Sequence, residues 1–184
     1  GVQTCALPIS VGYDMYVKLL SEAVAEEKGE IREGEEKPEC RIDLPVEAHI
    51  PETYIASTPQ RLSIYKRIAA IRNDADASDV YDELKDRFGN PPEAIMGLVE
   101  ISLLRNTAAK LGVYEISQKN GAVVLYMNEP DLDCVMALNR ELKGRVLLSA
   151  AKKAGISVKL GEEAPLETVR TCLDIMQAVK AEKV

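Results

Sequence analysis

The sequence predicts an α+β domain in which N-terminal helices are followed by a small, mostly antiparallel sheet and a closing C-terminal helix. Over residues 13–27 and 58–112, apolar residues recur at three- and four-residue spacing, as on one face of a helix. From residue 113 the period shortens to two, and helical spacing returns near the C-terminus. Helices and strands that are segregated in this way favour an α+β fold over a βαβ repeat.

The first 39 residues are expected to stand apart from the main domain. Residues 1–9 carry no pattern and are interpreted as a sequence scar, whereas residues 13–27 have the apolar stripe of an amphipathic helix. Residues 30–39 are acidic and contain few core-forming side chains, which is typical of a solvated linker. The main domain is therefore predicted to span residues 40–184, a length that suits one folded unit.

The main domain is predicted to begin with a strand over residues 40–48, because apolar residues alternate with polar ones there. Ile42, Leu44 and Val46 would share the buried face of this strand. Pro45 lacks the backbone N–H that a sheet ladder requires, so the strand should lie at an edge or break at this point.

Three helices are predicted between this strand and residue 112. Thr58 is the expected N-cap of the first helix, with a proline at the first helical position. Residues 73–75 are predicted to form a turn, and Ser78 to cap a short helix that ends at Gly89. A long helix with a wide apolar stripe follows a proline pair and closes at Gly112, so it should be the central core helix.

The C-terminal third carries the sheet. Asn120-Gly121 separates two runs rich in β-forming residues, 113–116 and 122–126, which is a strong hairpin signal. The remaining elements are expected to be a helix over 132–142, short strands at 146–148 and 156–160, and a final helix over 167–182.

The composition limits the possible functions. The chain has a net charge of −7, so its surface should repel phosphate, and no direct contact with nucleic acid is expected. An acidic surface suits instead a protein partner that presents a basic patch. No apolar run approaches the roughly 20 residues that cross a bilayer, so no membrane partner is expected.

Metal, cofactor and enzyme chemistry are not predicted. The four cysteines are far apart in sequence and there is one histidine, which disfavours a zinc site and fits reduced thiols in a cytoplasmic protein. No phosphate-binding loop, dinucleotide-binding glycine motif or hydrolase nucleophile motif is present, so the chain is predicted not to be an enzyme. His49 could act as a general base, but it is more simply a residue at the end of a strand.

Glu83, Asp86 and Arg87 are the candidate contact residues. Glu83 and Arg87 are four residues apart on a predicted helix, so they could pair with each other on one helix face. Alternatively, they could form salt bridges to another domain or molecule, where a carboxylate that faces a basic residue fixes the register of the interface. The sequence leaves both interpretations open.

Three blocks in this order and spacing carry a family resemblance: residues 43–55 (DLPVEAHIPETYI), 61–69 (RLSIYKRIA) and 83–89 (ELKDRFG). Together they resemble the C-terminal domain of bacterial transcription-repair coupling factors, the TRCF or Mfd family. Residues 11–16 also resemble the helix that follows the translocation motif of these proteins. The chain is therefore expected to start inside a translocase tail, without the motor itself.

The resemblance implies a role in transcription-coupled nucleotide-excision repair. Proteins of this family engage stalled RNA polymerase, translocate on DNA and recruit UvrA. Their C-terminal domain is implied to be a non-catalytic, autoinhibitory clamp that packs on the UvrB-like N-terminal module and masks its UvrA-binding surface. By motif, Glu83 is the first candidate for the salt bridge and Asp86 the second. The alternatives are a free-standing adaptor that binds RNA polymerase or another protein, and a small hydrolase that uses His49 and a thiol.

Overall fold

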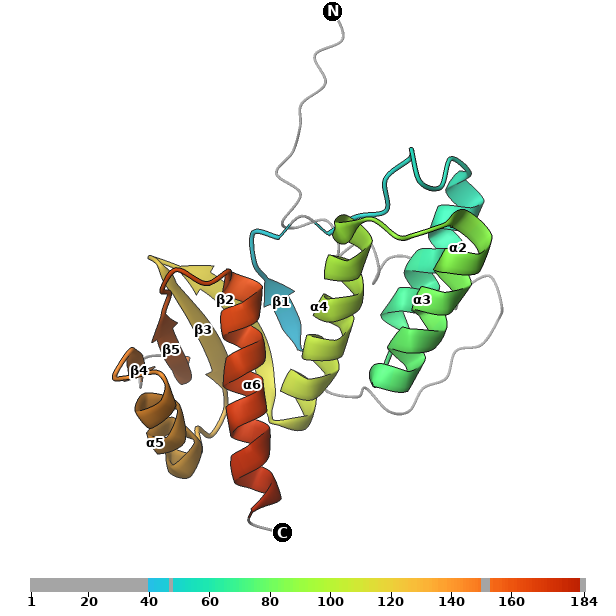
Figure 1. The fold of residues 1–184 in the computed structure, drawn as a ribbon. Helices are drawn as coiled ribbons and strands as arrows, with labels where there is room; N and C mark the ends of the chain where they lie inside the picture. The colour runs from blue at the N-terminus through green and yellow to red at the C-terminus, as the bar shows by residue number, and fades with distance from the viewer. Residues whose placement is uncertain (1–39, 47, 150–152, 183–184) are drawn as a thin grey trace, which may run out of the picture.

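The computed structural model describes residues 40–46, 48–149 and 153–182, which form a helical part and a sheet part side by side (Figure 1). The helical part comprises three helices, and the sheet part comprises five strands with two further helices. In chain order the elements are β1 (Arg41–Asp43), α2 (Thr58–Ala69), α3 (Asp74–Phe88), α4 (Glu93–Lys110), β2 (Val113–Lys119), β3 (Ala122–Met127), α5 (Leu132–Glu141), β4 (Val146–Ser149), β5 (Gly155–Lys159) and α6 (Pro165–Ala181).

The sheet has the strand order β1-β2-β3-β5-β4. β1 pairs parallel with β2, and the other neighbouring pairs are antiparallel, so the predicted α+β class is confirmed. The β2–β3 hairpin turns at Asn120 and Gly121, whose φ angles are 49° and 73°. Positive φ at both positions is what a tight two-residue hairpin turn requires.

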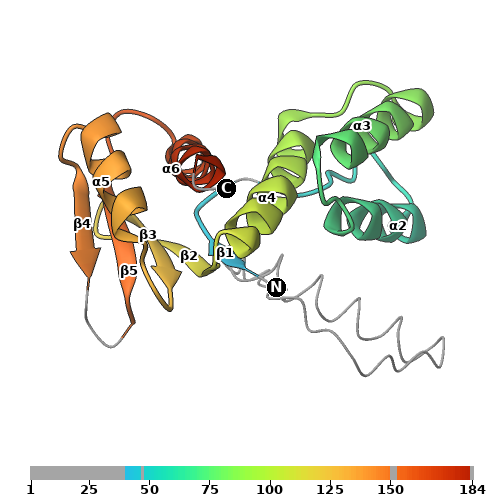
Figure 2. The same cartoon turned by 90° about the horizontal axis from the view of Figure 1, so that it is seen from below.

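One face of the sheet is covered by α4, α5 and α6, and no described element covers the other (Figure 2). Residues that face the helices are buried, among them Ile116, Leu125 and Ile156 on three neighbouring strands. The alternate residues of the same strands include Lys119 and Lys159 on the uncovered face. The middle of that face is not open to solvent, because Ser117, Val124 and Tyr126 on it are buried.

α4 joins the two parts. It packs against α2 and α3 on one side, and against the first strands of the sheet and α6 on the other. Seven of its residues are buried, including Ile95 and Leu98, which are fully inaccessible. The prediction of a central core helix is therefore confirmed. Ile64 and Ile68 of α2 and Leu84 of α3 belong to the same hydrophobic core.

Two predicted helix starts are wrong. α3 begins at Asp74, and its N-cap is Asn73, whose side-chain oxygen accepts a hydrogen bond from the Asp76 N–H at 2.9 Å. Ser78 therefore lies inside a 15-residue helix and not at its start. Thr58 is the first residue of α2 and not its N-cap, because Ser57 occupies the extended position before it. Polar residues within the first turn of α3 look like a turn in sequence, but here they satisfy the helix terminus.

The first strand is shorter than predicted. β1 ends at Asp43, two residues before Pro45, and lies at the edge of the sheet, as the missing N–H of that proline favours. Leu44 nevertheless remains in the core.

The predicted helix over residues 13–27 and the linker over 30–39 lie outside the described residues. Within the part of the chain that the structure describes, no helix is both long and apolar enough to cross a bilayer.

Candidate interdomain contact site

The loop after β1 is fastened to α3 through Tyr54. Its hydroxyl donates to the Gly89 carbonyl at 2.7 Å and lies 3.2 Å from the carbonyl of Leu84, and its ring packs 5.9 Å from that of Phe88. Burial, together with the neighbouring Tyr81, raises the pKa of Tyr54. The first sequence block thereby fixes the C-terminal end of the third.

The same loop is held to α2 by two further residues. Arg61 donates to the Ile55 carbonyl at 2.9 Å and pairs with Glu52 at the same distance. Tyr65 accepts a hydrogen bond from the Ile50 N–H at 2.8 Å. All three blocks that carry the family resemblance therefore meet in one loop–helix–helix unit.

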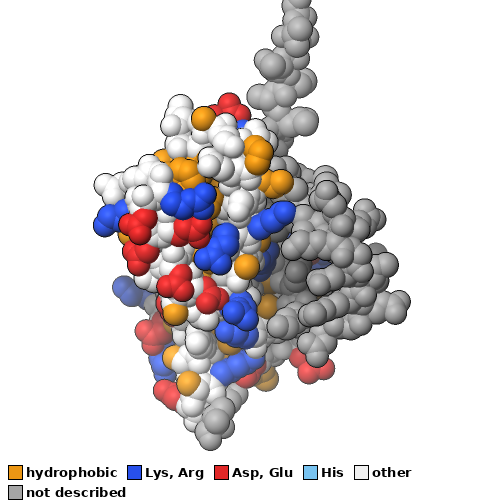
Figure 3. Space-filling model, turned by 90° about the vertical axis from the view of Figure 1, so that its right-hand side faces the viewer, with side chains coloured by type: hydrophobic (Ala, Val, Ile, Leu, Met, Phe, Trp, Pro, Cys, Tyr) orange, Lys and Arg blue, Asp and Glu red, His pale blue; other side chains and the backbone are white. Residues whose placement is uncertain are grey.

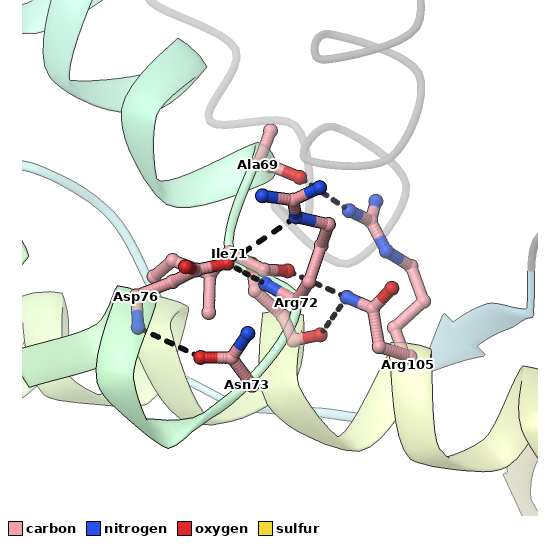
Figure 4. A network of polar contacts seen from close by, with 8 residues as sticks. Ala69, Ile71, Arg72, Asn73, Asp76 and Arg105 are labelled. Atoms are coloured by element: carbon pink, nitrogen blue, oxygen red, sulfur yellow. Dashed lines mark hydrogen bonds and ion pairs between the residues drawn. The ribbon is translucent and has the colours of Figure 1, made fainter.

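A polar network fixes the corner between α2 and α3 on α4 (Figure 4). Arg105 of α4 donates to the Ala69 carbonyl at 3.0 Å, and Asn106 donates to the Ile71 carbonyl at 2.6 Å. Asp76 accepts from the Arg72 backbone N–H at 2.9 Å. These contacts satisfy backbone groups at the end of α2 and set the direction in which α3 leaves the corner.

Glu83 lies between two arginines. One carboxylate oxygen is 2.6 Å from Nη1 of Arg87, four residues on in α3, and the other is 3.1 Å from Nε of Arg67 on α2. The intrahelical pair, one of the two interpretations that the sequence leaves open, is therefore present, together with a cross-helix bridge that the sequence did not reveal. Because the Glu83 side chain is 26% exposed, water partly screens both bridges.

Asp86 belongs to an exposed acidic stripe of α3, which consists of Asp79, Asp82 and Asp86. Their spacing of three and four residues places them on one side of the helix. None of the three forms an ion pair with any described residue. Sequence reasoning selected Asp86 but missed the other two, although the same helical spacing could have identified them.

The surface around this stripe carries both signs of charge. α3 contains six carboxylates and two cations, whereas the cations Arg61, Lys66 and Arg67 belong to α2. Figure 3 shows acidic and basic side chains interspersed over the described part of this end of the molecule. The site can therefore form charge-paired, register-specific contacts with another protein surface.

The remaining candidates among the described residues are one histidine and three cysteines. His49 is half-buried, and the side chains of Cys40, Cys134 and Cys172 are buried. Burial raises the pKa of the Cys172 thiol to about 12, so at neutral pH it is not a thiolate nucleophile. Within the described ranges, no three potential metal-ligating side chains cluster together.

The sequence of residues 44–135 matches the TRCF domain family, and this range contains the loop, α2, α3 and the acidic stripe. This chain belongs to the TRCF-domain family. The match also covers α4 and the β2–β3 hairpin, whereas β1 lies just before the matched range.

Several transcription-repair-coupling factors are similar to this TRCF domain. The one from Bacillus subtilis is 32% identical over 163 residues, which cover 89% of this chain and 13% of the relative. The one from Mycobacterium tuberculosis is 36% identical over 133 residues, covering 67% of this chain and 11% of the relative. The chain thus spans about an eighth of the length of the relatives that it matches.

The fold also has a solved counterpart. A crystal structure of the C-terminal domain of a transcription-repair coupling factor superposes with a TM-score of 0.68 at 20% identity. The superposition covers 80% of this chain and 98% of that structure. The described TRCF domain therefore has the architecture of a transcription-repair coupling factor C-terminal domain.

Proposed function

We propose that this chain is the non-catalytic regulatory domain at the C-terminus of a cytoplasmic transcription-repair coupling factor, and that it acts as an autoinhibitory clamp. It packs on the UvrB-like N-terminal module of the same protein and masks the UvrA-binding surface. Engagement of stalled RNA polymerase by the DNA translocase releases it, and transcription-coupled repair can then proceed. Family membership supports this assignment, and the acidic stripe of α3 supports the contact.

The observation that carries the proposal is the set of unpaired, exposed carboxylates on α3. Asp79, Asp82 and Asp86 make no ion pair among the described residues, so a basic surface can pair with them without first breaking internal bridges. Glu83 differs, because it must exchange Arg67 or Arg87 for a partner's cation. We therefore propose Asp86 as the first contact residue. Glu83 gives up an ion pair within the α2–α3 unit when it binds the partner's cation, so its change of partner couples docking to that unit.

The free energies of a few charge pairs are of the size that a switch between a closed and an open form requires. A closed form that is favoured by a few kcal/mol leaves the open form populated at about 0.1–10%. Removing one partner of a desolvated salt bridge costs about 2–5 kcal/mol, which is enough to invert that equilibrium. A clamp built on a few charge pairs can therefore be opened by a competing interaction elsewhere in the protein.

The test is UvrA binding by a full-length coupling factor that carries this domain. Asp86→Lys and Glu83→Lys should each increase UvrA binding, because charge reversal repels the basic surface. Glu141→Lys on α5 is the matched control and should leave UvrA binding unchanged. Arg67→Gln separates the two roles of Glu83, since it removes the cross-helix bridge and keeps the carboxylate. Unaltered UvrA binding in folded Asp86→Lys and Glu83→Lys proteins would refute the clamp.

A further inference from the structure

The large apolar side chains that are most exposed in the described part of the chain lie on two neighbouring elements, β4 and α5. Leu147 and Leu148 of β4 are 71% and 46% exposed, and Leu132 and Met136 of α5 are 65% and 63% exposed. The two α5 residues are four positions apart and so share one face of the helix. By strand register Leu148 lies on the face of the sheet where α5 packs, and Leu147 lies on the opposite face.

β4 is also an edge strand with open backbone groups. It pairs with β5 alone, and the Lys159 N–H donates to the Arg145 carbonyl at 2.9 Å at the start of this ladder. In an antiparallel ladder every second residue bonds to the same neighbour, so Leu147 and Ser149 bond towards β5. The backbone groups of Val146 and Leu148 therefore point away from the sheet, and no described residue bonds to them.

The opposite edge of the same sheet is protected. β1 carries the charged residues Arg41 and Asp43, and Pro45 follows two residues after its end. Charges and prolines at an edge are the features by which proteins discourage pairing with further strands. β4, with the sequence Val-Leu-Leu-Ser, has neither.

Cations flank β4 at both ends. Lys143 precedes it, is exposed and forms no ion pair with any described residue. Lys153 follows it, but its Nζ already pairs with Glu115 of β2 at 2.7 Å, whereas Lys159 is exposed on the uncovered face of neighbouring β5. Arg145 is already paired with Glu163 at 2.6 Å. The surroundings of the edge thus favour carboxylates on an incoming strand, in a chain that is acidic as a whole.

The same charges disfavour a second copy of this chain as the occupant. A second copy carries the same net charge of −7 and the same Lys143 beside its β4 edge, so its charges do not complement this edge. Like charges placed opposite each other across strands are destabilising. The complementary occupant is an extended segment that alternates apolar and acidic residues.

We propose that β4 binds such a segment of another protein as an added sixth strand. Its backbone bonds to Val146 and Leu148, and its apolar side chains cover Leu148 on the side of the sheet where α5 packs. Its carboxylates lie on the uncovered face, which carries Lys159, as in recognition by β-strand addition. β4 and α3 lie at opposite ends of the molecule (Figure 1), so this site is separate from the proposed clamp contact.

The test uses the full 184-residue chain and a blocked eight-residue peptide of alternating valine and glutamate. In nuclear magnetic resonance titrations, the peptide should shift the amide signals of residues 146–149. At about 90% saturation it should slow hydrogen exchange at Val146 and Leu148 about tenfold, since only the free fraction exchanges. A valine–lysine peptide of the same length should do neither.

Charge reversal provides the matched controls. Lys143→Glu should weaken binding of the valine–glutamate peptide, whereas Lys66→Glu on α2 should leave it unchanged. The proposal is overturned by unshifted β4 amides at millimolar peptide, or by equal binding of the lysine peptide. Concentration-dependent dimerisation that Leu147→Lys abolishes would also overturn it, because the edge would then be occupied by a second copy.

Discussion

At the scale of single residues, Glu83 and Asp86 differ in whether they form ion pairs within the described fold. Glu83 serves α2 and α3 through two arginines, whereas Asp86, one turn further along, makes no ion pair among the described residues. A substitution at Glu83 therefore tests folding and binding together, while one at Asp86 tests binding nearly alone. Stability measurements can separate these roles.

We expect Glu83→Gln to lower the free energy of unfolding by about 0.5–1 kcal/mol, because two partly screened bridges are lost. Asp86→Asn is the control and should change it by less than about 0.5 kcal/mol. Urea unfolding of both variants at moderate salt measures the difference. Equal stabilities for the two variants would show that the bridges to Arg67 and Arg87 contribute nothing to the fold.

The raised pKa of the Cys172 thiol predicts that the folded chain loses stability at alkaline pH. Its pKa is raised from 9.0 to about 12 in the folded chain, so only the unfolded chain ionises this thiol between those values. The stabilisation that arises from this difference in pKa is present below pH 9. It is lost as the pH rises towards 12, by at most about 1.4 kcal/mol per pH unit. The unfolding free energy should therefore fall more steeply from pH 8 to pH 10 in the original chain than in Cys172→Ala. Parallel pH profiles would contradict this assignment.

At the scale of elements, α3 shows where local sequence signals compete. Asn73 and Ser78 are both good capping residues, and each is followed by acidic side chains. Asn73 is selected because its side chain accepts a hydrogen bond from the Asp76 N–H, while the Asp76 side chain accepts one from the Arg72 N–H in the turn between α2 and α3. The start of the helix is thus set by a tertiary corner that sequence periodicity does not report.

This choice of cap gives a paired prediction. Asn73→Ala should lower the free energy of unfolding by about 1 kcal/mol, as expected for a lost N-cap. Ser78→Ala, inside the exposed part of the helix, should be neutral or stabilising by a few tenths of a kcal/mol, because alanine has the higher helix propensity. The two variants are compared by thermal and urea unfolding. A larger loss at Ser78 than at Asn73 would place the start of α3 where sequence alone suggested.

Elements with strong local signals could be predicted from the sequence. Asn120-Gly121 located the hairpin, and Gly89 and Gly112 marked the ends of α3 and α4, because each adopts a positive φ that few other residues tolerate. The parallel pairing of β1 with β2 could not be predicted, since it joins strands about 70 residues apart and no turn sets their register. For the same reason the open β4 edge became apparent only from the strand order.

At the scale of the whole molecule, the described fold presents two separate surfaces. The loop–α2–α3 unit carries the sequence blocks of the family and the acidic stripe, and the β4 end carries exposed leucines. Sequence reasoning located the candidate contact within α3 but not its geometry, because the bridge from Arg67 crosses between two helices. The C-terminal domain architecture follows from the family and the fold, while the clamp remains a proposal about one surface.

The most direct measurement is calorimetric binding of this chain to the isolated UvrB-like module of a transcription-repair coupling factor, at low and at moderate salt. The account predicts binding that weakens as salt rises, that Asp86→Lys reduces at least about tenfold, and that Glu141→Lys leaves unchanged. Binding is expected to be weak, because the covalent tether that raises the effective concentration in the parent is missing. No binding at high concentration of the folded chain, or binding that is insensitive to Asp86→Lys, would contradict the account, and binding to RNA polymerase instead would favour a free-standing adaptor.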